Sequence, residues 1–355
     1  MPRLLLMAAL VVLPVSARIV NAQQGQPNGA VREEEVVFPS GDITIAATLF
    51  LPPGPGPHTA VVIAHGSDRA TRKSPHYREG AMRCSQAGVA VLLADKRGVG
   101  DSGGEYVEAP DLRVPAGDVL SAARYLQARS DIKRSNIGVL GGSQGGWVSF
   151  LAALSGEIAF VVSISGPGVS VLEQVVYIRG QEMLAQGLSQ DAVDAASRYR
   201  RLLYGYYGTG SGRGDMQRVL DSVRTEAWFR HAEFRDALPP AAELSTPRFD
   251  FYRNLRFDPD SVLDRSSVPV LAVFGGMDRN VPVDASVTRM RAAFVRGGNG
   301  DATIVVFPRA GHGIGLVRDS TAHGAPAHGA QELAPGYVDL VLQWLRRQAQ
   351  RAPGT

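Results

Sequence analysis

A serine placed between pairs of glycines, in the stretch VLGGSQGG (residues 139–146), is the first candidate for chemistry in this sequence. The spacing Gly141-x-Ser143-x-Gly145 follows an apolar run typical of a strand and precedes a run with helical spacing. A sharp strand-to-helix turn exposes a serine hydroxyl, requires small neighbours, and directs helix N–H groups at the site. The pattern therefore predicts that Ser143 is a nucleophile; the alternative is a plain flexible turn.

A nucleophilic serine needs a general base, and His312 is the best placed of the seven histidines. It follows the apolar run IVVFP in the sequence IVVFPRAGHG, so it lies on a loop after a late strand. Where a catalytic serine lies on a strand-to-helix turn of this kind, its partners follow it along the chain in the order acid, then histidine. His323 and His328 come later among small residues, and because no carboxylate or thiol pattern accompanies them we expect solvated side chains and no metal site.

The base needs an orienting carboxylate, for which Asp278 is the candidate. It stands directly after the apolar run VPVLAVFGG, where a buried acid would reach an imidazole on a neighbouring loop. Asp284 is the rival, but its place at the start of a predicted helix favours a capping role.

Two backbone N–H groups are predicted to stabilise the oxyanion of the tetrahedral intermediate. One belongs to Gln144, the residue after the nucleophile, and the other to Ser67, in the loop His65-Gly66-Ser67 that ends the stretch VVIAHGS. His65 is expected to be structural. Asp95 and Arg97, in the glycine-punctuated loop DKRGVGDSGG, are expected to hold the loops of the site together.

Alternating strands and helices must position these residues. Apolar runs that read as buried strands alternate with helical runs over residues 31–165 and again over residues 266–350, which predicts a mostly parallel sheet covered by helices on both faces. Residues 166–265 break this rhythm: they are polar, helical and rich in aromatic residues, and no strand is evident. We therefore expect a helical cap inserted into an α/β core.

Five segments occur in the order AHGS, DKRGVGDS, GGSQGG, GGMDRNVP and AGHG, and together they resemble the α/β-hydrolase superfamily. Within it the chain is similar to secreted bacterial carboxylesterases of the EstD type, which are related to prolyl-oligopeptidase-like serine hydrolases. The resemblance implies an α/β-hydrolase fold with an eight-stranded sheet, and hydrolysis through an acyl-enzyme without a cofactor. Gly142 departs from the pattern, since many relatives carry a larger residue before the nucleophile.

The N-terminus predicts export. Residues 1–22 combine Arg3, an apolar run from Leu4 to Val15 and a small-x-small site at Val20-Asn21-Ala22, as in a signal peptide. Its removal would lower the formal charge from +3 to +1, because two arginines and no acid leave with it. We expect a secreted or periplasmic protein with no stable membrane association and no nucleic-acid partner. The single cysteine, Cys84, is expected to be a buried small hydrophobe.

These observations predict a serine esterase that acts on small-molecule esters with short to medium acyl chains. Aromatic residues of the cap favour an apolar pocket. A peptidase or aminopeptidase of the prolyl-oligopeptidase type is the competing interpretation, with Glu173 or Glu182 as candidates to bind a free amino terminus. A thioesterase uses the same residues. A non-catalytic binding protein on a hydrolase scaffold is the alternative from another class.

Overall fold

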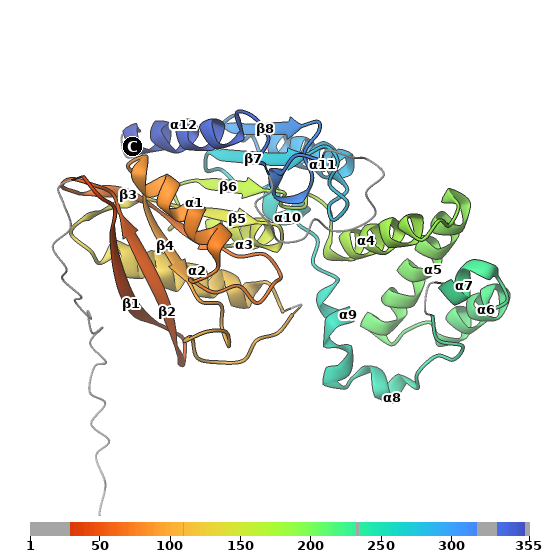
Figure 1. Ribbon diagram of the computed structural model, residues 1–355. Coiled ribbons are helices and arrows are strands. Elements are labelled where there is room, and N and C mark those ends of the chain that lie inside the picture. The colour runs from red at the N-terminus through yellow and green to blue at the C-terminus, as the bar shows by residue number, and fades with distance from the viewer. Residues whose placement is uncertain (1–28, 109, 232–233, 318–331, 352–355) are drawn as a thin grey trace, which may run out of the picture.

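The computed structural model of the chain describes residues 29–108, 110–231, 234–317 and 332–351. Its centre is one sheet of eight strands (Figure 1). The strands are β1 (Arg32–Ser40), β2 (Ile43–Leu51), β3 (His58–Ala64), β4 (Ala90–Ala94), β5 (Ile132–Gly142), β6 (Val161–Ile164), β7 (Val270–Gly275) and β8 (Ala302–Phe307).

The sheet is mostly parallel, as predicted, and its order is β1-β2-β4-β3-β5-β6-β7-β8. Only the β1–β2 and β2–β4 pairs are antiparallel. The parallel run from β4 to β8 places the carboxyl ends of six strands along one edge, which is where open α/β sheets bind their ligands.

Twelve α-helices and two short 3₁₀ turns accompany the sheet in the described residues. The helices are α1 (Pro75–Gln86), α2 (Arg113–Gln127), α3 (Gln144–Ala153), α4 (Val171–Ala185), α5 (Gln190–Thr209), α6 (Arg213–Val223), α7 (Ala227–His231), α8 (Ala241–Leu244), α9 (Asp250–Asn254), α10 (Asp260–Leu263), α11 (Val283–Arg296) and α12 (Tyr337–Gln350). The 3₁₀ turns are η1 (Pro247–Phe249) and η2 (His312–Ile314).

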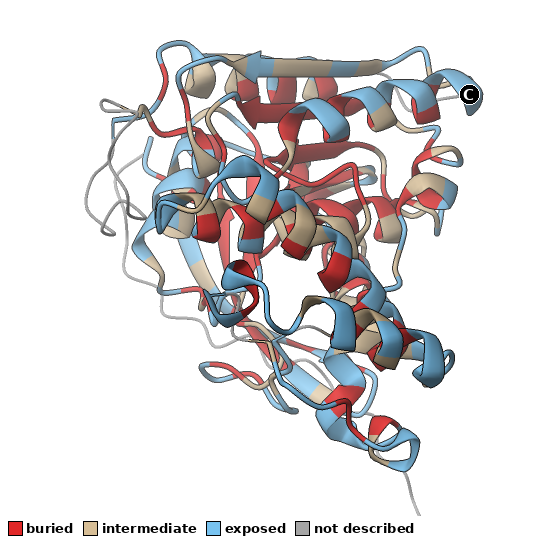
Figure 2. Cartoon of the chain, turned by 90° about the vertical axis from the view of Figure 1, so that its right-hand side faces the viewer, coloured by how far each residue is buried: buried red, intermediate tan, exposed pale blue. Residues whose placement is uncertain are grey.

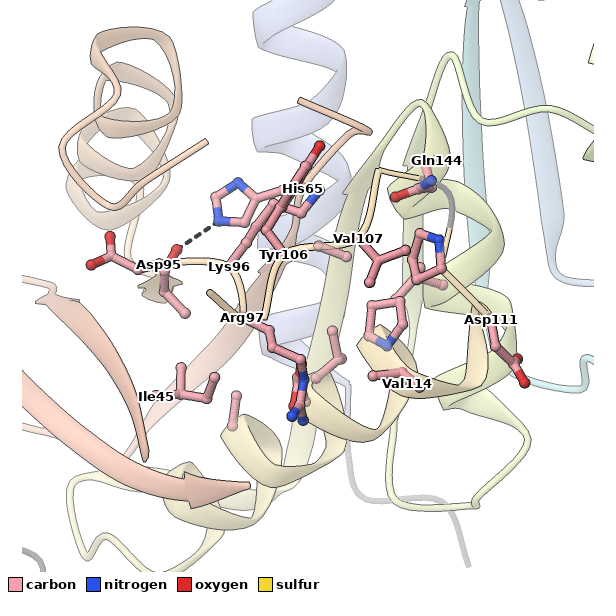
Figure 3. A pocket seen from close by; sticks show the side chains of 18 of the residues that line it. Ile45, His65, Asp95, Lys96, Arg97, Tyr106, Val107, Asp111, Val114 and Gln144 are labelled. Atoms are coloured by element: carbon pink, nitrogen blue, oxygen red, sulfur yellow. Dashed lines mark hydrogen bonds and ion pairs between the residues drawn. The ribbon is translucent and has the colours of Figure 1, made fainter. Parts of the chain in front are cut away.

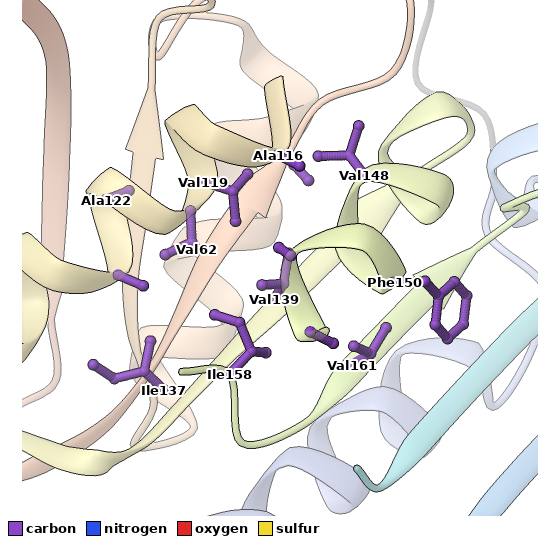
Figure 4. Packing of buried hydrophobic residues seen from close by; sticks show 14 of the residues in the cluster. Val62, Ala116, Val119, Ala122, Ile137, Val139, Val148, Phe150, Ile158 and Val161 are labelled. Atoms are coloured by element: carbon purple, nitrogen blue, oxygen red, sulfur yellow. The ribbon is translucent and has the colours of Figure 1, made fainter. Parts of the chain in front are cut away.

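Helices cover both faces of the sheet because side chains alternate along each strand. On β3, Val62 packs in one apolar cluster with α2, α3 and α11, whereas its neighbour Val61 packs in a second cluster with α1 and α12. Figure 4 shows part of the first cluster, where Val119 and Ala122 of α2 face Val62. Strands buried on both faces explain the continuous apolar runs of the sequence, and Figure 2 shows the buried sheet behind helices with exposed outer sides.

The chain between β6 and β7 forms helices and no strand in its described residues. Helices α4 to α9 lie to one side of the sheet, with α5 in the middle of a separate apolar cluster (Figure 1). The rings of Tyr199, Phe229 and Phe234 lie within 5.6 Å of one another in that cluster. The short helix α10 instead joins the core, because Val262 and Leu263 pack with α3 and α11. The division into core and cap at residues 166 and 265 stays a prediction.

Cys84 is buried on α1, as predicted, and burial raises the pKa of its thiol to about 12. The proposed signal peptide, residues 1–22, lies outside the described residues. Among the helices that the structure describes, none is both long and apolar enough to cross a membrane.

The close packing around Gly138 of β5 predicts that a side chain at this position destabilises the fold. A side-chain carbon at this position would overlap the ring of Phe160, which is almost fully buried. Gly138→Ala is expected to lower the free energy of unfolding by about 1–3 kcal/mol, measured by urea denaturation. Gly80→Ala is the matched control: Gly80 lies on α1 with open space around it, so this change is expected to leave stability unchanged or to raise it. Equal stability of the two variants would contradict the packing argument.

Candidate active site

Ser143 lies on the sharp turn between β5 and α3. Its backbone has φ 53° and ψ −119°, a strained conformation for any residue other than glycine. The Ser143 N–H donates to the carbonyl of Ile164 at the end of β6, at 2.9 Å, which fixes the turn against the sheet. The structure therefore has the sharp strand-to-helix turn that the motif requires, and the role of Ser143 as a nucleophile stays a prediction.

Two glycines of the motif, Gly141 and Gly145, are required because backbone carbonyls lie too close to them for a side chain. A side-chain carbon at Gly145 would collide with the carbonyl of Ala64 at the end of β3, and one at Gly141 would collide with the carbonyl of Gly145. At Gly142, in contrast, no atom lies within 4 Å of the place that a side-chain carbon would take. Gly141 and Gly145 are therefore structural requirements of the turn, whereas a side chain at position 142 would meet no neighbouring atom.

Asp278 and His312 form a pair. Asp278 Oδ2 lies 2.8 Å from His312 Nδ1, and the carboxylate is fully buried while the imidazole is partly exposed. The second oxygen, Oδ1, accepts hydrogen bonds from the N–H groups of Asn280 and Val281. The rival acid, Asp284, is exposed in the first turn of α11, and it makes no side-chain capping bond.

The loops that carry this pair are joined by backbone contacts. A side chain at Gly275 would collide with the carbonyl of Gly311, and the Met277 N–H donates to the Ala310 carbonyl at 2.8 Å. From the insertion, the Tyr177 hydroxyl of α4 donates to the carbonyl of Asp278 at 3.0 Å. Helix α4 is thus tied to the turn that holds the acid, a contact that no sequence pattern signals.

Ser143 and His312 lie on the same edge of the sheet. A series of hydrogen bonds connects the strand ends between them: Ser143 N–H to Ile164, Ser165 N–H to Val273, and Gly276 N–H to Phe307. No hydrogen bond joins the Ser143 hydroxyl to His312 within the described residues. The structure therefore forms the acid–base pair and leaves the serine on the same edge without a direct bond to the base.

The loop after β3 borders the nucleophile. A side-chain carbon at Gly66 would lie 3.7 Å from the Cβ of Ser143. The Gly66 N–H donates to the Tyr77 hydroxyl at 3.0 Å, so it is already occupied. In the described part of the chain neither the Ser67 N–H nor the Gln144 N–H has a hydrogen-bond acceptor, which leaves both of the predicted oxyanion donors available.

Two side chains that sequence reasoning missed hold this loop by its carbonyl oxygens. Lys96 Nζ donates to the carbonyls of Gly66 and Asp68, at 2.7 and 3.0 Å, and the Tyr106 hydroxyl donates to the carbonyl of Ser67 at 2.6 Å. Burial lowers the pKa of Lys96 to about 8. Three consecutive carbonyls are therefore fixed from the next loop, which orients the Ser67 N–H.

Asp95 and Arg97 hold loops together as predicted, but with different partners. Asp95 pairs with the Arg72 guanidinium and accepts from the Arg72 N–H at 2.7 Å. Arg97 pairs with Asp118 on α2 at 2.7 Å, and Ser40 donates to the same carboxylate. Arg72 was not singled out from the sequence, because a lone arginine between Thr71 and Lys73 carries no recognisable pattern.

A cavity of about 360 Å³ opens beside Gln144 (Figure 3). It lies between the sheet and α2 and is covered by the loop that carries Lys96 and Tyr106. From the insertion, Asp250 and Asn254 of α9 contribute to its rim. No group of three acidic, histidine or cysteine residues that would hold a metal ion occurs in the described residues. His323 and His328 lie outside them.

The family model described as serine aminopeptidase, S33, matches residues 55–316, about three quarters of the chain. The chain belongs to this family. The S33 match begins in the loop before β3 and ends just after η2, so it includes Ser143, Asp278 and His312.

The S33 chain is also 26% identical over 256 residues to Esterase EstD of Thermotoga maritima, which confirms the predicted resemblance. The match covers 69% of this chain and 53% of EstD, so the chain spans about half the length of that relative.

Solved structures confirm the α/β-hydrolase fold of this S33 member. The α/β hydrolase GrgF of a Penicillium species matches with a TM-score of 0.55 and 18% identity, covering 90% of this chain and all of GrgF. Est1E of Butyrivibrio proteoclasticus, solved with ferulic acid bound, matches with a TM-score of 0.51 and 18% identity, covering 88% of this chain and 96% of Est1E.

Burial of His65 predicts that the stability of the protein falls as the pH is lowered. The His65 Nε2 lies 2.7 Å from the Ala94 carbonyl, its ring packs edge-on against Tyr77, and burial lowers its pKa to about 4. The unfolded chain binds a proton at His65 near pH 6.5, whereas the folded chain does so only near pH 4, so acidification across this window favours unfolding. The free energy of unfolding is expected to fall by about 2 kcal/mol between pH 7.5 and 5 on this account.

The control for His65 is His65→Gln, whose amide can still donate to the Ala94 carbonyl. Urea denaturation at both pH values is expected to show a smaller loss of stability in this variant than in the wild type. Equal losses in the two proteins would contradict a buried neutral His65.

Proposed function

We propose that this protein is a serine hydrolase that cleaves carboxylic esters with short to medium acyl chains. The observation that carries the proposal is the Asp278–His312 hydrogen bond, on the same sheet edge as a serine in the elbow conformation. The match to the S33 family and the similarity to EstD support it.

The acyl-transfer half of the reaction starts at Ser143. His312 Nε2 takes the hydroxyl proton as the oxygen attacks the acyl carbonyl, while Asp278 keeps the Nδ1 proton in place and stabilises the imidazolium. The N–H groups of Ser67 and Gln144 bind the oxyanion. His312 then gives the proton to the alcohol oxygen, and the alcohol leaves an acyl ester on Ser143.

The hydrolytic half uses the same groups in reverse roles. His312 takes a proton from water as the water oxygen attacks the acyl-enzyme carbonyl. Collapse of the second tetrahedral intermediate breaks the bond to Ser143, whose oxygen recovers the proton from His312, and the carboxylic acid is released. No step requires a metal or an organic cofactor.

The charges of the insertion favour an ester over a peptide with a free amino terminus. Glu173 is paired with Arg201 and Glu182 with Arg179, each at 2.8 Å. On the rim of the cavity, Asp250 is paired with Arg253. Carboxylates that are already neutralised by arginine are poor anchors for a substrate ammonium group, which weighs against the aminopeptidase alternative.

Ser143→Ala tests the nucleophile. Hydrolysis of p-nitrophenyl esters from acetate to decanoate is expected in the wild type and is expected to fall by at least 10³-fold in the variant, because the acyl-enzyme cannot form. A fluorophosphonate probe is expected to label the wild type and not the variant. A folded wild type that is labelled but hydrolyses no ester would favour amide or thioester substrates. Absence of labelling would favour the binding-protein alternative.

Asp278→Asn tests the acid–base pair without changing its shape. Loss of the carboxylate is expected to lower kcat on the order of 10³- to 10⁴-fold, since His312 is no longer held in the tautomer that accepts the serine proton. Asp284→Asn is the matched control, an exposed acid six residues away, and it is expected to retain the wild-type kcat. Similar losses in the two variants would contradict the role of Asp278.

We also propose that the protein is exported and that residues 1–22 are removed. N-terminal sequencing of protein recovered from the bacterial periplasm or medium is expected to begin after Ala22, or after Ala17, where a second site of small residues ends. Recovery of the chain with Met1 intact from these fractions would contradict cleavage.

A further inference from the structure

The cavity beside Gln144 lies on a definite side of the nucleophile. In the sheet order, Ser143 follows β5 and His312 follows β8, so the base lies beyond β6 and β7. The cavity is lined on the opposite side, by Ile45 of β2, Val62 of β3 and Ala94 of β4. Figure 3 shows it extending from Gln144 at the start of α3 towards Ile45.

The chemistry of ester cleavage determines on which side of Ser143 the alcohol and the acyl part of the substrate lie. His312 protonates the leaving alcohol, so the alcohol must lie on the side of the base. The acyl substituent projects from the same carbonyl carbon in another direction, and the cavity, which Gln144 lines, lies on the side of the turn away from the base. We infer that this cavity is the acyl-binding site and that it takes an uncharged, medium-length acyl chain. This inference rests on the ester hydrolysis proposed above.

The deep walls of the cavity are apolar. Phe38, Ile45, Val62, Val119 and Ala122 line it, and each is less than one tenth exposed. Burial of hydrocarbon against such walls is favourable for each methylene that leaves water. An acyl chain that fills this space is therefore bound by the same interaction that stabilises the core beneath it.

The buried and partly buried charged groups that line the cavity are already engaged, whereas the Glu105 carboxylate, which also lines it, is exposed. The Arg97 guanidinium and the Asp118 carboxylate neutralise each other, Asp95 is paired with Arg72, and the Lys96 ammonium donates to two carbonyls. An ionised acyl group would lose its hydration without gaining an unpaired partner among these deep groups, which costs free energy. The occupant is therefore expected to be neutral along its length.

The volume limits the length of the chain. A cavity of about 360 Å³ is large enough to hold an acyl chain of several carbon atoms, since a water-sized group takes roughly 30 Å³. Val119 stands at the middle of the α2 wall and Val114 at its exposed end, near the mouth. Both positions are expected to set the preferred chain length.

Two opposite substitutions of Val119 test the assignment. The readout is the ratio of kcat/KM for p-nitrophenyl octanoate to that for the acetate, because the acetyl group does not extend into the cavity. Val119→Phe removes space and is expected to lower this ratio on the order of tenfold. Val119→Ala adds space and is expected to move the optimum of the ester series to longer chains. An unchanged ratio and optimum in both folded variants would overturn the inference.

Val114→Phe provides a second test at a position that is 44% exposed, where folding is not at risk. It is expected to lower the ratio in the same direction. The matched control is Val295→Phe on α11, which is 81% exposed and away from the cavity, and which is expected to keep the wild-type ratio. Equal ratios in these two variants would also count against the cavity.

A binding measurement tests the acyl site independently of the proposed ester hydrolysis. Calorimetry with p-nitrophenyl octanoate and the Ser143→Ala protein measures occupation of the cavity without turnover. Binding is expected, and adding Val119→Phe to this protein is expected to weaken it on the order of tenfold. If no ester is hydrolysed by the wild type, the proposed function fails while this measurement still decides on the cavity. Unaltered binding in the double variant, or none in Ser143→Ala, would overturn the acyl site.

Discussion

Contact between the β5–α3 turn and the end of β3 sets the geometry of the whole candidate site. The turn at Ser143 lies so close to Ala64 that glycine is required at position 145, and this closeness holds the serine in a backbone conformation that free peptides avoid. The surrounding sheet supplies the free energy that keeps it there, through the bond from Ser143 N–H to Ile164 and the apolar packing of α3 on both β5 and β6. The strain is therefore supported by the core.

The same closeness brings the loop after β3 to the nucleophile. Lys96 and Tyr106 then hold that loop by three successive carbonyls, and the Lys96 ammonium also lies 5.3 Å from the centre of the Tyr106 ring. The loop that carries both residues folds back on itself through the bond from Gly98 N–H to the Gly103 carbonyl. Two loops therefore stabilise each other at the site. The loop after β3 lies beside Ser143, and the loop that carries Lys96 and Tyr106 lies over the cavity.

Much of this arrangement was predictable from the sequence, for physical reasons. Strands buried on both faces must be apolar throughout, so β3, β5 and β7 stand out, and a parallel sheet places the residues after these strands on one edge. The sequence predicts Ser143, Asp278 and His312 as site residues in that way, and the structure joins Asp278 to His312. It does not join His312 to Ser143 by a hydrogen bond in the described residues, and no periodicity in the sequence bears on that distance.

Other features of the site had no local signal. The contacts of Lys96 and Tyr106 with the loop after β3 depend on how a glycine-rich turn folds back, and that turn has φ values of 67° at Gly98 and 59° at Gly100. The bond from Tyr177 to Asp278 joins residues 101 positions apart. The cavity has walls from five separate segments (residues 38–45, 62–65, 94–122, 144–148 and 250–254), and no sequence pattern signals that they meet.

The order of the strands along the chain has a consequence for biosynthesis. Ser143 and the cavity walls on β2, β3 and β4 are translated before the helical insertion, whereas Asp278 and His312 follow it, in the loops after the last two strands of the sheet. A nascent chain therefore contains the β5–α3 turn long before it contains the acid–base pair, and the last residues of the cavity lining, Asp250 and Asn254, arrive with the insertion. A chain that stops short of His312 would carry Ser143 without the base that the proposed mechanism requires.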